Sequence, residues 1–162
     1  MGITFNANEI FEMAEEMEKN GAKFYRKAAQ NTSDSQTKQM LLDMADMEDN
    51  HLQTFKEMRQ QLSGRETEDT MFDPENEAAM YLQVMADSHG YEGKISPDEE
   101  LTGKETPKEI LGIALNSEKE SVVFYSGLKS LVPPKAGRGK VKAIIREELV
   151  HITTLLSKLK SL

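Results

Sequence analysis

Apolar residues recur every three or four positions in four long segments of this chain. That spacing is typical of an amphipathic helix with one buried face. No segment of useful length alternates between apolar and polar residues as a half-buried strand does. The pattern therefore predicts an all-α protein with helices over about 8–30, 35–62, 107–131 and 140–160.

Local signals mark the ends of these helices. The polar sequence NTSDS at 31–35 separates the first two with residues that favour helix caps. Thr106 precedes Pro107 and has Glu109 three positions later, a capping box with proline at the first helical position. Pro133-Pro134 ends the third helix, because proline cannot continue a helix and restricts the residue before it.

The segment 63–106 is too long for a tight turn between two helices. We expect it to contain a short helix at about 75–88 and to carry the chain from one end of a helical hairpin to the other. Two antiparallel hairpins, 8–62 and 107–161, joined by one long crossover make the ferritin-like type of four-helix bundle. Residues 1–162 are predicted to form this one domain.

Polar residues interrupt the apolar faces in a repeated pattern. The sequence Glu-x-x-His occurs at 48–51 and again at 148–151, an offset of 100 residues. At the same offset, Glu-x5-Phe-Tyr occurs at 18–25 and 118–125. The repeat thus identifies six candidate metal ligands: Glu18, Glu48, His51, Glu118, Glu148 and His151.

Hairpin geometry predicts that these residues meet. Residues equidistant from the turn of an antiparallel hairpin lie at the same height. The midpoint of 18 and 48 is 33, inside the first polar break, and the midpoint of 118 and 148 is 133, the first proline. Each hairpin therefore brings its single glutamate level with its Glu-x-x-His, whose two side chains share one helix face.

Four unpaired buried carboxylates would be costly, or most of them would have to be protonated. Two divalent cations would balance their charge, with the two imidazoles as further ligands. The chain has no cysteine, so any metal must be bound by oxygen and imidazole nitrogen. This donor set accepts iron, manganese or zinc.

The repeated segments resemble the rubrerythrin branch of the ferritin-like di-iron carboxylate superfamily. They are MEKNGAKFY at 17–25, MADMEDNHLQTF at 44–55, NSEKESVVFY at 116–125 and IIREELVHITTL at 144–155. The resemblance covers all four helices and implies two iron ions. It implies that Glu48 and Glu148 bridge the ions and that Glu18 and Glu118 are terminal ligands. His51 and His151 would each bind one ion.

Two departures from rubrerythrins bear on function. The lack of cysteine rules out a rubredoxin-type iron site within this sequence, so an electron donor would be separate. Rubrerythrins also have a further glutamate three residues after the ligand of the third helix, where this chain has Ser121. The equivalent position in the first half is Gly21. Peroxide reduction of the rubrerythrin type is less strongly implied than ferrous iron binding and oxidation.

Other residues near the repeat leave alternatives open. Tyr25 and Tyr125 lie two turns after their glutamates, where they serve either core packing or the orientation of a glutamate across the bundle. Small residues at 21 and 121 either leave room for a substrate or allow close helix packing. Glu147 is assigned to a solvated face, and His89 to the surface or a cap.

Composition limits the remaining function classes. The 28 acidic and 20 basic residues give a net charge of −8, which disfavours nucleic-acid binding. Neither a membrane span nor a signal peptide is evident, so we expect a cytoplasmic protein. The leading hypothesis is a di-iron oxidoreductase that reacts with hydrogen peroxide or dioxygen and forms a homo-oligomer, most simply a dimer. The alternatives are an iron-binding or iron-delivery protein without catalysis, and a helical interaction module with a structural metal.

Overall fold

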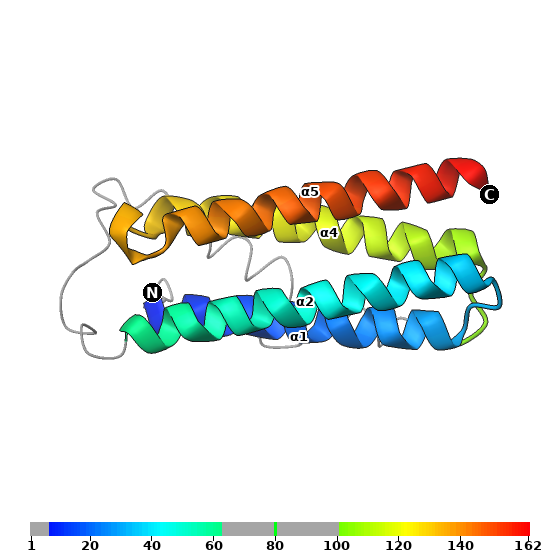
Figure 1. Ribbon diagram of the computed structural model, residues 1–162, viewed down its shortest axis with the longest axis horizontal. Helices are drawn as coiled ribbons and strands as arrows, with labels where there is room; N and C mark the ends of the chain where they lie inside the picture. Colours follow the sequence, from blue (N-terminus) through cyan, green and yellow to red (C-terminus); the bar gives the residue numbers. More distant parts are fainter. Residues whose placement is uncertain (1–6, 63–79, 81–100) are drawn as a thin grey trace.

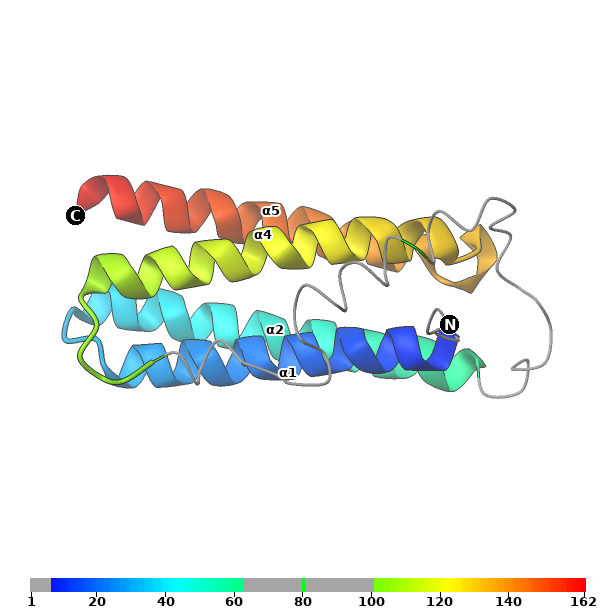
Figure 2. The same ribbon diagram turned by 180° about the vertical axis from the view of Figure 1, so that it is seen from behind.

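In a computed structural model, two helical hairpins lie side by side (Figures 1 and 2). The structure describes residues 7–62, 80 and 101–162. Helices α1 (Ala7–Gln30) and α2 (Ser35–Leu62) form the first hairpin. Helices α4 (Pro107–Leu131) and α5 (Arg138–Ser161) form the second, with a short 3₁₀ helix, η1 (Pro134–Ala136), in its turn. The predicted all-α, ferritin-like four-helix bundle is confirmed.

The helix ends follow the local signals. Asp34 caps α2 by accepting a hydrogen bond from the Thr37 amide at 2.8 Å. At the start of α4, Thr106 and Glu109 form the predicted capping box, in which each side chain accepts from the other residue's amide. The predicted short helix at 75–88 lies outside the described residues apart from Met80.

Helix α5 begins earlier than the predicted position near 140. Gly137 has a φ of 109°, a left-handed conformation that favours glycine, and it turns the chain directly from η1 into α5. A Cβ atom at this position would lie 2.9 Å from Met58 Cε of the other hairpin. The glycine thus serves both the turn and the close approach of the hairpins.

Two apolar clusters fill the interior, one toward each end of the bundle. The first contains Phe11, Phe55 and Phe124, and the second contains Phe24 and Leu111. On every helix, the candidate ligands fall in sequence between residues of the first cluster and residues of the second. The polar repeat is therefore enclosed by apolar core on both sides. No helix in the described ranges is both long and apolar enough to cross a membrane.

Candidate metal centre

All six candidate ligands of the repeat meet in the middle of the bundle. Their exposed fractions lie between 0% and 4%: Glu18 1%, Glu48 4%, His51 2%, Glu118 3%, Glu148 0% and His151 2%. They form two groups, each with ligand atoms within 4.8 Å of one another. The groups are Glu18, Glu48, His51 and Glu148, and Glu48, Glu118, Glu148 and His151.

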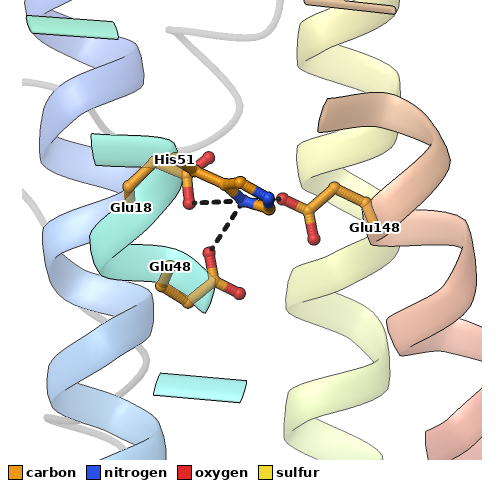
Figure 3. Close-up of side chains that lie close together, drawn as sticks. All are labelled: Glu18, Glu48, His51 and Glu148. Atoms are coloured by element: carbon orange, nitrogen blue, oxygen red, sulfur yellow. Dashed lines mark ion pairs between the residues drawn. The ribbon is translucent and has the colours of Figure 1, made fainter. Parts of the chain in front are cut away.

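The first group surrounds Nδ1 of His51 (Figure 3). This nitrogen lies 3.4 Å from Glu18 Oε2, 3.7 Å from Glu48 Oε2 and 3.1 Å from Glu148 Oε1. Three helices thus present carboxylates to one ring nitrogen: α1, α2 and, from the other hairpin, α5. We call this group the His51 position.

The second group repeats this arrangement around Nδ1 of His151. The nitrogen lies 3.5 Å from Glu48 Oε1, 3.3 Å from Glu118 Oε1 and 2.9 Å from Glu148 Oε2. We call this group the His151 position. Glu48 and Glu148 therefore offer one oxygen to each position, whereas Glu18 and Glu118 each face only one.

This geometry matches what two bridging and two terminal carboxylates require. A bridging carboxylate must direct its two oxygens to different ions, and Glu48 and Glu148 each direct one oxygen to the His51 position and the other to the His151 position. Gly21 lies directly beside Glu48, since a Cβ there would lie 3.4 Å from the Glu48 side chain, at van der Waals contact. Its counterpart Ser121 is partly buried and donates its hydroxyl proton to the Ser117 carbonyl oxygen at 3.2 Å, within its own helix.

Unpaired polar atoms converge at the same place. Of the side chains that the structure describes, five fully buried N and O atoms make no hydrogen bond: Glu18 Oε2, His51 Nδ1, Glu148 Oε1 and Oε2, and His151 Nδ1. Each Nδ1 lies 2.9 to 3.4 Å from one or more of these oxygens, but none of these pairs is a hydrogen bond. Buried polar atoms are costly without partners. Cations bound by oxygen and nitrogen would satisfy all five, so the site fits two metal ions.

Two buried tyrosines connect the hairpins at this level. Tyr25 on α1 donates a hydrogen bond to Glu118 Oε1, and Tyr125 on α4 donates one to Glu18 Oε1. Burial raises the pKa of each phenol well above its usual value, and the nearby carboxylates add to the shift. Both hydroxyls therefore stay protonated and hold a glutamate of the opposite hairpin, in addition to packing in the core.

When no metal is bound, the four carboxyl groups form two pairs whose pKa values are shifted in opposite directions. Burial raises the pKa of Glu18 and Glu118 well above the usual range, and repulsion from neighbouring carboxylates adds to it. Burial also acts to raise the pKa of Glu48 and Glu148. The pKa of Glu48 is nevertheless lowered, first by its contact with Glu18 and then by its contacts with the two histidines. The pKa of Glu148 is lowered mainly by its contacts with His151 and His51.

Both histidines are held as cations in this state. Burial alone would lower the pKa of an imidazole, but here contacts with the surrounding carboxylates outweigh burial. The pKa of His151 is raised to about 12, and that of His51 is raised well above its usual range. Two imidazolium ions then balance the Glu48 and Glu148 carboxylates, and the raised pKa values of Glu18 and Glu118 favour their neutral acid forms.

The family comparison agrees with this arrangement. The rubrerythrin family model matches residues 6–94, just over half of the chain. The chain belongs to the rubrerythrin family. The matched range contains the first hairpin with Glu18, Glu48 and His51, and the second hairpin repeats that pattern.

A solved structure has the same fold over almost the whole chain. It is the crystal structure of a protein from Thermotoga maritima described as a ferritin-like diiron-carboxylate protein. The two share 22% sequence identity, with a TM-score of 0.70 over 97% of this chain and 96% of the other. The search of curated proteins found no match. This rubrerythrin-family chain therefore has a ferritin-like fold in both described hairpins, including the second hairpin, which lies beyond the family match.

One contact of this rubrerythrin-family centre was not expected from the sequence. The apolar pattern assigns Glu147 to a solvated face, and 49% of its side chain is indeed exposed. Its Oε2 nevertheless lies 2.6 Å from Nε2 of His51, on the side of the ring away from the other carboxylates. In the 100-residue repeat, Glu147 is equivalent to Met47, because each directly precedes the glutamate of a Glu-x-x-His sequence. This equivalence is the sequence signal that could have indicated Glu147. His89 lies outside the described residues.

Proposed function

We propose that this protein is a non-haem di-iron oxidoreductase that uses ferrous iron to reduce hydrogen peroxide or dioxygen. The supporting observation is the position of Glu48 and Glu148, each of which offers one oxygen to the His51 position and the other to the His151 position. In this proposal Glu48 and Glu148 would each bind both metal ions. Glu18 and His51 would complete the ligands of one ion, and Glu118 and His151 those of the other.

The protein's own residues prepare the site for redox chemistry. When bound, two ferrous ions would supply two electrons, which with two protons convert one hydrogen peroxide to two water molecules. The apolar clusters on both sides of the centre limit the access of bulk water. Tyr25 and Tyr125 hold the terminal carboxylates in place by hydrogen bonds from the opposite hairpin.

Turnover needs a source of electrons outside the centre. No cysteine occurs in the 162 residues, so the donor is proposed to be a separate group that reaches the protein from outside this sequence. The assembly of the chain into a homo-oligomer, its cytoplasmic location and its lack of nucleic-acid partners stay predictions.

Anaerobic loading with Fe²⁺ tests the proposal. Metal analysis should find two ions per chain, and mixing with peroxide or dioxygen in the presence of a reductant should give repeated oxidation in stopped-flow absorbance. One slow oxidation without turnover would instead indicate an iron-binding protein. Failure to bind iron at all would refute the di-iron proposal and favour a helical interaction module.

Bridging is tested separately by substitution. Glu48→Ala or Glu148→Ala should abolish binding of the two-metal set, because each removes one ligand from both positions. Glu57→Ala is the matched control, since Glu57 is exposed on α2 and accepts a hydrogen bond from Gln53. Full occupancy in both bridging variants would contradict the assigned roles.

A further inference from the structure

The outer nitrogens of the two histidines have different partners. His51 Nε2 faces the Glu147 carboxylate of α5 at 2.6 Å. His151 Nε2 faces the Met47 thioether of α2, with a nitrogen–sulfur distance of 3.4 Å. Each partner precedes a bridging glutamate, and each contacts the histidine of the other hairpin. The centre is thus nearly symmetric in its ligands and asymmetric just outside them.

The two partners differ in how strongly they accept a hydrogen bond. A carboxylate is a charged acceptor, and hydrogen bonds to it are about twice as strong as neutral ones. A thioether sulfur is only a weak acceptor. Because both Nδ1 atoms face the glutamates, a metal would bind there and Nε2 would carry the ring proton. The Nε2–H of His51 then donates to a carboxylate, and that of His151 to sulfur.

This difference changes the imidazole as a ligand. An acceptor that draws on the Nε2 proton increases electron density on the ring and makes Nδ1 the stronger donor to a metal. The negative charge of Glu147 also favours a cation at the His51 position, although exposure of the side chain weakens this effect by solvent screening. Met47 is an uncharged, weak acceptor, so it brings no negative charge to the His151 position and does not make His151 Nδ1 a stronger donor.

From these contacts we propose that Glu147 is a positioning residue that makes the two metal positions unequal. The His51 position binds a divalent cation more tightly and fills first, and the His151 position fills second. The inference rests on the proposed di-iron function, because it concerns the same centre. Position 121 does not create the difference, since neither Ser121 nor its counterpart Gly21 brings a carboxylate to the site.

The test is a titration of the metal-free protein with Co²⁺, an oxygen-stable substitute for Fe²⁺. Two binding steps are expected, and anomalous diffraction from crystals with one equivalent of Co²⁺ should show the ion mainly at the His51 position. Glu147→Gln should weaken the first step by about 10- to 100-fold, as is typical for removal of an outer partner of a metal-bound histidine. Glu57→Gln makes the same charge change on α2 and should leave both steps unchanged.

Reciprocal substitutions separate this role from a general effect on folding. Met47→Leu removes the weak acceptor and should change neither step by more than about threefold. The double variant Glu147→Met with Met47→Glu exchanges the two partners and should reverse the order of filling. In proton NMR of the Co²⁺-loaded protein, Glu147→Gln should shift the exchangeable ring N–H signal of His51 and leave that of His151 in place.

The outcomes distinguish this inference from the proposed function. If wild type binds two ions with equal affinity, or Glu147→Gln behaves as Glu57→Gln does, the inference is overturned and the di-iron proposal stands. An unchanged filling order in the double variant would also overturn it. If the protein binds no Co²⁺ or Fe²⁺, the proposed function fails and the inference fails with it.

Discussion

Adding two divalent cations to the metal-free protein should release about four protons near pH 7. Two come from Glu18 and Glu118, whose pKa values are raised by burial and by neighbouring carboxylates. The other two come from the Nδ1 atoms of His51 and His151, whose imidazoles are held protonated by the carboxylates around them. These four protons occupy the site in place of the four positive charges that two metal ions bring.

The number of protons released also determines how metal affinity depends on pH. Protons compete with metal, so affinity rises as pH rises through the range in which all four groups are protonated in the metal-free protein. Each proton contributes about 1.4 kcal/mol per pH unit, so the free energy for binding both ions should change by about 5.5 kcal/mol per unit. Calorimetry with Mn²⁺ in buffers of different ionisation enthalpy measures the proton number directly.

A conservative variant provides the internal check. Glu18→Gln removes one of the four protonated groups and keeps a carbonyl oxygen toward the His51 position, so it should release about three protons. Release of two or fewer from wild type would show that Glu18 and Glu118, or the two histidines, are already deprotonated before metal arrives. The charge assignment of the metal-free centre would then be wrong.

Two further predictions concern stability without metal, measured by urea unfolding. Tyr25→Phe leaves Glu118 without its buried hydroxyl partner and should lower the free energy of unfolding by about 1 to 3 kcal/mol; an unchanged value would show that the ring contributes packing alone. Gly137→Ala should also destabilise, by about 1 to 2 kcal/mol or more, because alanine is strained at a φ of 109° and its Cβ meets Met58. Gly112→Ala, in the α4 interior with open space around it, should be neutral or stabilising by up to about 1 kcal/mol, and equal effects of the two glycine variants would contradict the strain argument.

Local sequence signals were sufficient for most of the fold. Helix propagation, caps and proline stops depend on residues within a few positions of one another, so α1, α2 and α4 lie within one residue of their predicted ranges. The start of α5 was missed by two residues, since the left-handed Gly137 shortens the turn. The meeting of the six ligand candidates was also predictable, because a 100-residue repeat and equal distances from two turns determine height in an antiparallel pair.

Contacts between the hairpins could not be predicted from local sequence signals, because the packing of one hairpin on the other decides them. No local pattern states how far α2 lies from α5, or which ring nitrogen of a histidine faces inward. The packing of the hairpins decides that Nδ1 of each histidine faces the glutamates and that Tyr25 and Tyr125 reach carboxylates across the bundle. The sequence alone determined that four glutamates and two histidines share a buried level. Only the packing of one hairpin on the other placed Glu147 against His51 and Met47 against His151, because those contacts join residues about 100 positions apart.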